Sequence, residues 1–208
     1  MVDIVKLMLA LSSGYLLGSL NTALIVSRFY GKDIRQHGSK SAGLTNTLRV
    51  LGKSAAAFVL VGDILKGVIA CLIGLYLSVY FYSESAQVCI SLLIAGTGAV
   101  VGHNWPVFFG FKGGKGVLTA VTVLFMVNWL MALICLGFFV LIVASTRYVS
   151  LGSVCAAMLF VVLSFFPVFE STFYFNLFAC FMTAMVVFKH RENIRRLLLG
   201  TENKLRLR

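Results

Sequence analysis

Residues 116–146 read GVLTAVTVLFMVNWLMALICLGFFVLIVAST, a run of 31 residues without a charged side chain. A helix of about 20 apolar residues is enough to cross the hydrocarbon core of a bilayer, so one helix through this run would exceed a single crossing. A break near Asn128-Trp129, where a polar residue meets an aromatic one suited to the membrane interface, would divide the run into two spans. The choice between one span and two decides the topology of the chain.

The composition is that of a helical membrane protein. Of the 208 residues 60% are hydrophobic, and only 18 basic and 7 acidic side chains are present. The mean hydropathy is +0.96. A soluble domain of this size could not cover itself with so few polar groups, and uncharged runs of this length are typical of membrane spans. We do not expect a cleaved signal peptide, because the first apolar run, residues 7–26, lacks a basic segment before it and is too long.

The remaining apolar runs predict the other spans and a single membrane domain over residues 1–208. We expect spans at 4–27, 55–82, 86–101, 149–166 and 172–188, with turns at 83–85 and 167–171. The polar segments 28–54, 102–116, 146–150 and 189–208 are then expected in the cytoplasm. With no soluble domain, any activity must lie in the membrane body and these segments.

The distribution of basic residues favours seven spans. If 116–146 crossed once, there would be six spans, and the tail with its seven Lys and Arg would lie across the membrane from the basic segment 28–54. That arrangement violates the positive-inside tendency. With a break near Asn128 the amino terminus lies outside, the carboxyl terminus is cytoplasmic, and Asp3, Glu84 and Glu170 lie outside. Five spans, with the last two runs merged, is the alternative, although Pro167 disfavours a continuous helix there.

The net charge of +11 is interpreted in this membrane context. In so apolar a chain, basic residues are expected to set topology, attract anionic lipid or bind anionic substrates, and we expect no nucleic-acid partner. The cysteines all lie inside apolar runs without metal or redox spacing, and we assign no chemistry to them: Cys71, Cys89, Cys135, Cys155 and Cys180.

A glycine-lysine loop at 102–116 separates two apolar runs and predicts an anion-binding site. Glycine can take positive φ and turn successive amides toward one point, and lysine adds a full positive charge. The predicted cradle comprises Lys112, Gly113, Gly114, Lys115 and Gly116. It is not a nucleotide P-loop, because Gly110 is one residue too close to the Gly-Lys pair and no Ser or Thr follows that pair. The alternative is a flexible basic loop at the membrane surface.

Residues 38–49, GSKSAGLTNTLR, form a second segment rich in hydrogen-bond donors. An arginine fork matches phosphate oxygens, and hydroxyls and amides can add further contacts. The candidate phosphate contacts are Ser39, Thr45, Asn46 and Arg49. The alternative is an ordinary polar loop with a helix N-cap at Ser41 or Thr45.

The segment after the last apolar run, KHRENIRR at 189–196, is a candidate for proton transfer. If the helix continues, His190 and Asn193 face the same way and could fix a hydroxyl or phosphate and move a proton near neutral pH. The alternative is a basic stop-transfer sequence in which Glu192 pairs with Arg195 or Arg196.

Three further features lie near these segments. The hydroxyl of Ser150 could face the same site or cap a helix. His103 could orient the glycine-lysine loop, although a histidine at a helix end more often makes local hydrogen bonds. Asp63 and Lys66 lie three residues apart inside a span, where mutual neutralisation is favoured over a catalytic role.

Together these segments resemble the bacterial acyl-phosphate-dependent glycerol-3-phosphate acyltransferases, the PlsY family. The similarity follows the chain in order, and Lys-Gly-Gly-Lys-Gly at 112–116 combined with His-Arg-Glu-Asn at 190–193 is its most specific part. Other matching segments are 18–20, 38–49, 52–53, 63–67, 102–103, 106–108, 147–150 and 200–202. The sequence departs from the usual family pattern at Lys40, Ser41 and Leu44, where Gly, Asn and Ala are common.

The resemblance implies a seven-helix inner-membrane enzyme with its active site facing the cytoplasm. Such an enzyme makes lysophosphatidic acid and phosphate from a fatty acyl phosphate and glycerol 3-phosphate, without a metal or cofactor, and could meet the enzyme that supplies acyl phosphate. By the same resemblance, Ser39, Arg49, Lys115 and Ser150 match substrate phosphate contacts. His190 and Asn193 match residues of the glycerol phosphate site.

The residues themselves also bear on alternative mechanisms and functions. An acyl phosphate already carries a good leaving group, so we expect no covalent acyl-enzyme. Acyltransferases of another class use a His with an Asp five positions later, and none of His37, His103 and His190 has one. The alternative function is a transporter or flippase for a phosphorylated anion, but the ionisable groups gather at one expected membrane face instead of mid-bilayer. A structural membrane subunit would leave that gathering unexplained.

Overall fold

The computed structural model describes residues 4–79, 90–169 and 171–205, and the regular elements within them are all helical. The all-helical prediction is therefore confirmed for the described residues. Expectations that concern Asp3, the turn at 83–85 with Glu84, Cys89 and Glu170 lie outside them. The helices form two compact units, which meet in sequence between Val127 and Asn128.

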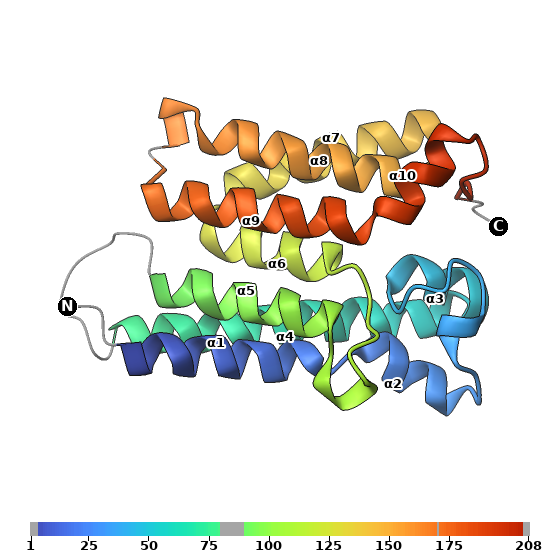
Figure 1. Cartoon of the computed structure of the whole chain (residues 1–208), viewed down its shortest axis with the longest axis horizontal. Helices are drawn as coiled ribbons and strands as arrows, with labels where there is room; N and C mark the ends of the chain where they lie inside the picture. The colour runs from blue at the N-terminus through green and yellow to red at the C-terminus, as the bar shows by residue number, and fades with distance from the viewer. Residues whose placement is uncertain (1–3, 80–89, 170, 206–208) are drawn as a thin grey trace. The chain divides into compact units, whose positions relative to one another are not determined.

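The first unit is built on three neighbouring helices, α1, α4 and α5 (Figure 1), with α6 packed against α4 and α5. Shorter elements connect them and carry the polar segments. In order, the elements are α1 (Ile4–Ser19), α2 (Thr22–Phe29), η1 (Ile34–Gln36), α3 (Leu44–Leu51), α4 (Lys53–Val79), α5 (Ile90–Asn104), η2 (Val107–Phe109) and α6 (Val117–Val127).

Two glycine pairs let α1 and α5 pack backbone to backbone. Gly14 and Gly18 lie one turn apart on α1, and Gly98 and Gly102 are spaced in the same way on α5. A Cβ on any of the four would overlap backbone atoms of the opposite helix. Small residues four apart are the usual means of close helix approach in membranes. This contact fixes the carboxyl end of α5, from which the glycine-lysine loop begins.

The second unit contains α7 (Trp129–Thr146), α8 (Val149–Ser164), η3 (Pro167–Phe169), α9 (Phe173–Lys189) and α10 (Arg191–Leu198). Helix α8 packs against both α7 and α9. The rings of Phe160, Phe175 and Phe178 meet between α8 and α9, with Phe160 edge-on to Phe175 at 5.8 Å. At His190 the chain bends by 59° between α9 and α10, so the helix does not continue straight through residues 189–196, which was the condition for the predicted common face of His190 and Asn193.

The predicted break near Asn128-Trp129 is confirmed. Helix α6 ends at Val127 and α7 begins at Trp129. Asn128 caps α7, because its side-chain oxygen accepts a hydrogen bond of 2.9 Å from the amide of Met131. A polar residue that satisfies an otherwise open helix end explains why the uncharged run divides at this point.

Four segments of the described chain are long and apolar enough to cross a bilayer: Ile4–Phe29, Lys53–Ser78, Ile90–Phe109 and Trp129–Thr146. The bent pair α9 and α10 would make a fifth. Helices α6 and α8, with 11 and 16 residues, are shorter. Seven crossings and the orientation of the termini stay predictions.

Candidate active site

The first apolar segment is broken between α1 and α2, and the buried Asn21 lies at this junction. No role for this residue was predicted from the sequence. Helix α1 ends at Ser19 and α2 begins at Thr22. The oxygen of the Asn21 side chain accepts a hydrogen bond from Leu24 N at 3.1 Å and caps α2. Its amide nitrogen donates to the carbonyls of Ala42 and His103, each at 3.4 Å. One side chain thus joins the end of α1 to both polar loops of the first unit.

A buried ion cluster formed by Asp63, Lys66 and His103 lies beside this junction. Lys66 Nζ is 2.8 Å from Asp63 Oδ1 and also 2.8 Å from His103 Nδ1. The expected pairing of Asp63 with Lys66 is confirmed, and His103 of α5 is its unexpected third member. Because the ammonium group can only donate, His103 Nδ1 accepts and the imidazole proton lies on Nε2. The cluster is then electrically neutral, as a buried set of charges must nearly be.

The glycine-lysine loop packs tightly onto His103. The amide of Gly114 donates to the His103 carbonyl at 3.1 Å. A Cβ on Gly114 would overlap His103 Nε2 and the Ala42 carbonyl, and one on Gly113 would overlap the His103 carbonyl. Gly116 has φ +70°, which disfavours any side chain. The loop is therefore held in place by His103 and Ala42, which argues against the alternative of a flexible basic surface loop.

The two lysines of this loop differ in exposure. Lys112 is exposed and Lys115 is half-buried, and both lie in the irregular stretch before α6. A half-buried ammonium group interacts with an anion more strongly than one in bulk water.

Asn46 organises the donor-rich segment 38–49 from inside. Its side-chain oxygen accepts from Ser39 N at 2.8 Å, and its amide nitrogen donates to the carbonyls of Ile34 and His37 at 3.1 and 3.0 Å. The side chain is buried. The side-chain amide of Asn46 thus engages the loop backbone and places Ser39. Its predicted contact with phosphate stays a prediction.

Helix α3 begins without a side-chain cap. Its N-cap is Gly43, so the alternative of a cap at Ser41 or Thr45 is wrong. Thr45 is half-buried on the first turn of α3, and Arg49 is exposed on its last turn. Ser39, Asn46, Arg49 and residues 112–116 are called the loop cluster below.

Lys40 has a left-handed backbone. Its φ is +57°, and that of Gly38 nearby is +60°. A left-handed residue with a Cβ costs roughly 1–2 kcal/mol relative to its right-handed form, whereas glycine adopts this conformation freely. Lys40 thus replaces the glycine common in the family at a position whose backbone conformation favours glycine.

In the second unit Glu202 collects three donors from different parts of the chain. Ser150 Oγ and Asn193 Nδ2 donate to Glu202 Oε1 at 2.8 and 2.7 Å. Arg196 Nε donates to Glu202 Oε2 at 2.7 Å. We call these four residues the tail cluster. Arg196 thus pairs with Glu202 and not with Glu192, and Ser150 contacts a carboxylate instead of capping α8, whose N-cap is Tyr148.

The environment of Glu202 favours its ionised form. Burial raises the pKa of this carboxyl, but the hydrogen bonds from Asn193, Arg196 and Ser150 outweigh burial and bring the pKa below its usual range. A carboxylate is the stronger acceptor, so the ionised form is also the one that best fixes its three donors. Glu202 had no assigned role in the sequence prediction, although it belongs to the matching segment 200–202.

The carboxyl-terminal segment is fastened to the loop before α8. Arg147 ends α7 with φ +64°, and its carbonyl accepts a hydrogen bond from Leu205 N at 2.8 Å. Lys204 Nζ lies 5.4 Å from the centre of the Tyr148 ring. These contacts hold Glu202 within reach of Ser150.

His190 lies at the bend between α9 and α10 and is buried. Its Nδ1 is 2.8 Å from the Val186 carbonyl, which can only accept, so Nδ1 carries a proton. In the neutral ring Nε2 then holds the lone pair. Asn193 lies one turn later on α10 as part of the tail cluster.

The predicted site residues therefore fall into two groups. In the first unit Asn21 joins the segment 38–49, at Ala42, to the glycine-lysine loop, at His103. Asn46 holds Ser39 within that segment, and Arg49 lies on α3. The second unit brings Ser150 and Asn193 together through Glu202. Asn21, Arg196 and Glu202 are the members that the sequence did not predict.

Comparison with known proteins places this arrangement in a family. A family model described as glycerol-3-phosphate acyltransferase matches residues 8–200. A glycerol-3-phosphate acyltransferase of Thermoanaerobacter pseudethanolicus is 45% identical over 192 residues, which cover 92% of this chain and 91% of the relative. One of Clostridioides difficile is 44% identical over 200 residues, with the same coverage.

Two solved structures are also similar to this chain. Both are crystal structures of PlsY, an integral membrane glycerol 3-phosphate acyltransferase, and both are 36% identical in sequence. The glycerol 3-phosphate form has a TM-score of 0.86 and covers 96% of each chain. The lysophosphatidic acid form has a TM-score of 0.82 and covers 96% of this chain and 95% of its own.

Proposed function

The chain belongs to the glycerol-3-phosphate acyltransferase family and is an acyltransferase of the integral membrane PlsY type, and we propose that its acyl donor is a fatty acyl phosphate. The products are 1-acyl-glycerol 3-phosphate and inorganic phosphate. The observation that carries the proposal is the glycine-lysine loop packed on His103, a rigid set of amides beside a half-buried lysine. Such a loop suits phosphate groups of both substrates.

We assign the stabilisation of the negative charge on the substrate phosphates to the loop cluster. Two substrates that each carry a phosphate repel one another, and negative charge leaves with the departing phosphate. Arg49, Lys115 and the amides of 113–116 would stabilise that charge, with Ser39, Thr45 and Lys112 as further contacts. Asn46 acts as a positioning residue, since its contact with Ser39 N sets the loop that presents the serine.

We assign the attacking hydroxyl to the second unit. The hydroxyl oxygen of glycerol 3-phosphate forms a bond to the acyl carbonyl carbon, the bond from that carbon to the phosphate oxygen breaks, and phosphate leaves. His190 Nε2 would accept the hydroxyl proton, with an oxygen of the departing phosphate as the alternative acceptor. Asn193 and Ser150, both held by Glu202, would orient the substrate.

We further propose seven crossings with the amino terminus outside and the active site facing the cytoplasm at the bacterial inner membrane. The break at Asn128, which divides the long uncharged run, supports this count. Single-cysteine accessibility labelling at positions 49, 112, 147 and 204 tests it. All four positions should react from the cytoplasmic side. Position 147 would lie outside in the five-span alternative, and labelling of any of the four from the outside would overturn the topology.

The acyl donor is tested with the purified protein. Acyl phosphate and glycerol 3-phosphate should give lysophosphatidate without added metal or nucleotide, and acyl-CoA should not replace acyl phosphate. Arg49→Ala and Lys115→Ala should each lose most of the rate, whereas Lys53→Ala, which removes an exposed charge outside the cluster, should not. Product formed from acyl-CoA alone would disprove the proposed donor.

The same preparation separates catalysis from transport. In vesicles, an enzyme converts both substrates, while a transporter or flippase would move a phosphorylated anion across the bilayer without forming an ester. A rapid quench that traps a covalent acyl-protein would contradict direct transfer between substrates.

A further inference from the structure

A basic pocket lies in the first unit, at the carboxyl end of α2. Its volume is about 310 Å³. The residues that matter for its chemistry are Ser27, Arg28, Lys32, Asp33, Arg35 and Phe109. None of them belongs to the loop cluster or to any role assigned above.

The turn after α2 brings two cations to one wall of this pocket. The amides of Gly31 and Lys32 donate to the carbonyls of Arg28 and Ser27 at 3.0 and 3.1 Å, and Gly31 takes φ +63°. A left-handed glycine of this kind reverses the chain directly after a helix. As a result Lys32 returns toward the last turn of α2, where Arg28 lies.

The other charges of the pocket neutralise each other. Arg35 holds Asp33 with two side-chain contacts, Nη2 to Oδ2 at 2.8 Å and Nε to Oδ1 at 3.0 Å. This fork-to-carboxylate geometry satisfies the acidic group. Arg35 also donates to the Phe109 carbonyl at 3.3 Å, which ties η1 to η2. Two positive charges therefore remain in the balance of the pocket, those of Arg28 and Lys32.

Arg28 is held at the wall by an aromatic ring. Its guanidinium carbon lies 4.9 Å from the centre of the Phe109 ring. A cation over a ring face is attracted by the ring and restricted in its motion, yet its N–H donors can still reach an anion. A preorganised guanidinium beside a lysine is suited to phosphate oxygens.

The surroundings of the pocket favour a lipid over a soluble ligand. Phe29, next to Arg28 in the sequence, is 86% exposed, and Phe108 and Phe111, within two positions of Phe109, are 55% and 57% exposed. The pocket also lies at the end of the candidate span Ile4–Phe29. Aromatic and basic side chains at the end of a span are typical of the interface with lipid head groups.

We propose that this pocket binds the phosphate of an anionic phospholipid, held between Arg28 and Lys32, with the lipid chains against the exposed aromatic residues. The site is separate from the loop cluster and does not depend on the identity of the acyl donor. Its occupant would be a resident lipid of the membrane and would not be consumed by the reaction.

The test uses the full-length protein in nanodiscs of phosphatidylcholine with phosphatidylglycerol as the probe. Phosphatidylglycerol retained per protein is measured by native mass spectrometry. The double variant Arg28→Gln/Lys32→Gln should retain at least fivefold less than wild type. Arg28→Lys, which keeps the charge and loses the planar fork, should retain an intermediate amount.

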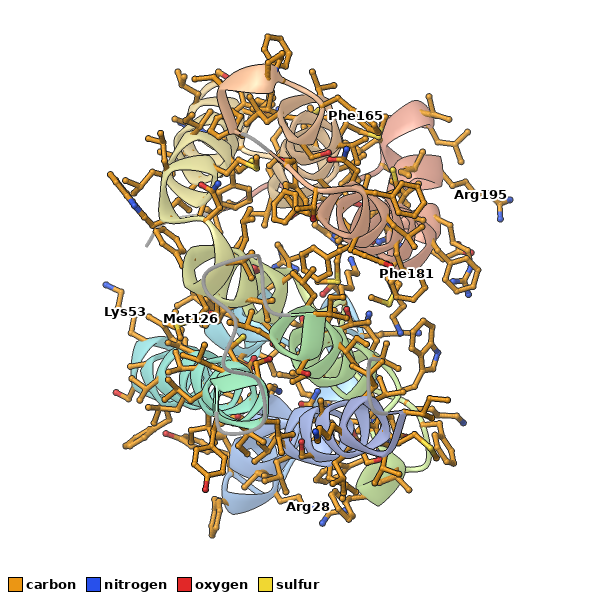
Figure 2. All side chains as sticks on the ribbon, turned by 90° about the vertical axis from the view of Figure 1, so that its left-hand side faces the viewer. Arg28, Lys53, Met126, Phe165, Phe181 and Arg195 are labelled. Atoms are coloured by element: carbon orange, nitrogen blue, oxygen red, sulfur yellow. The ribbon has the colours of Figure 1, made fainter. Side chains whose placement is uncertain are left out.

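The matched control removes two other exposed charges, Lys53 and Arg195, whose side chains point outward in Figure 2. Lys53→Gln/Arg195→Gln should retain as much phosphatidylglycerol as wild type. An equal loss in this control would mean general electrostatic attraction and would overturn the site. Equal thermal unfolding of the variants establishes that the pocket variant is folded.

A final arm distinguishes lipid phosphate from free phosphate. Inorganic phosphate is titrated against wild type and the pocket variant in phosphatidylcholine nanodiscs, with binding followed by phosphorus NMR. The pocket variant should lose phosphatidylglycerol and leave inorganic phosphate binding at the loop cluster unchanged. A variant that loses inorganic phosphate and keeps phosphatidylglycerol would contradict a lipid site.

Discussion

The buried ion cluster of the first unit and the tail cluster of the second unit are each built on one carboxylate, and they hold their surroundings in opposite ways. Asp63 lies within α4, and its side chain is 1% exposed between Lys66 and His103. Glu202 lies outside the helices and gathers donors from α8 and α10. Asp63 supports the polar loops of the first unit from within a helix, whereas Glu202 fastens the carboxyl-terminal segment to the ends of helices.

The two clusters should respond differently when one of their contacts is lost. Water cannot replace a lost partner inside packed apolar helices, so a broken contact in the first unit should cost stability directly. In the second unit the side chain of Glu202 is only 6% exposed, but that of Arg196 is 34% exposed, so water can reach the cluster from the Arg196 side. The ionisation of one carboxyl should decide whether the terminal segment stays in place.

The largest effect is expected from breaking the buried ion cluster. Lys66→Met leaves Asp63 buried beside His103 alone, and removing one partner of a buried pair costs about 3–5 kcal/mol. The free energy of unfolding, measured in detergent by denaturant titration, should fall by that amount. The glycine-lysine loop should loosen with it, because His103 supports Gly114.

The double variant Lys66→Met/Asp63→Leu separates charge from packing. It removes both charges and should recover most of the lost stability, since a neutral apolar pair of similar volume is tolerated. If the double variant were as unstable as Lys66→Met, the loss would be due to packing and the comparison of the two carboxylates would fail.

The next effect tests the rigid glycine-lysine loop. In Gly114→Ala the new Cβ meets His103 Nε2 and the Ala42 carbonyl, so the loop must move. Overpacking of this kind costs about 1–3 kcal/mol of folding stability. Because a displacement of roughly an ångström would misplace the amides that bind phosphate, kcat/KM for glycerol 3-phosphate should fall about 100-fold. Steady-state kinetics measure it.

Gly43→Ala is the control for that experiment. Gly43 has φ −161° and open space at its Cβ position, so the substitution should change kcat/KM little. A comparable loss in both variants would point to a general sensitivity of the polar loops and not to the contact with His103.

Short-range features of this chain were predictable from the sequence, because they depend on local periodicity. The three-residue spacing of Asp63 and Lys66 predicted their contact, and the polar residue within 116–146 predicted the helix break. Both depend only on residues within a few positions of one another. The all-helical architecture follows in the same way from the length of the apolar runs.

The long-range contacts could not be predicted in this way. Asn21 reaches the His103 carbonyl across 82 positions, and Ser150 reaches Glu202 across 52. No periodicity links residues so far apart, and an asparagine in an apolar run or a glutamate in a basic tail is only a hint. For the same reason the hydrogen bonds of Asn46 to the carbonyls of Ile34 and His37 could not be predicted, since these partners meet only once the segment 34–46 has folded.

A moderate, pH-dependent effect is expected at Glu202. Glu202→Gln keeps one acceptor but loses the charge that binds Arg196, at a cost of about 2 kcal/mol. Because the pKa of Glu202 lies below its ordinary value of 4.5 when folded, its contribution is present above that value and is lost as the pH falls through the lowered pKa. The thermal stability of wild type should therefore exceed that of the variant at neutral pH and approach it in acid.

Glu192→Gln removes the same charge from an exposed position of α10 and should show no such pH dependence. Hydrogen exchange at Leu205 N, which bonds to Arg147, gives a local measurement of whether the terminal segment has detached. A stability difference at Glu202 that stayed constant into acid would contradict an ionised carboxylate as the centre of the tail cluster.

The smallest effect is expected at the left-handed backbone of Lys40 in the first unit. Lys40 is exposed and has φ +57°, so its conformation is imposed by the loop that Asn46 holds, not by its own side chain. Lys40→Gly removes the cost of a left-handed residue with a Cβ but adds conformational freedom to the unfolded chain, so the free energy of unfolding should rise by about 0.5–1 kcal/mol.

Ser41→Gly is the control, because Ser41 is the next residue and does not have positive φ. This substitution only adds freedom to the unfolded chain, so the free energy of unfolding should fall by a similar amount. Denaturant titration of both variants measures the difference. If both substitutions to glycine lowered the free energy of unfolding equally, the loop held by Asn46 would not be imposing the positive φ of Lys40. The difference between the buried first unit and the tail cluster would then have less support.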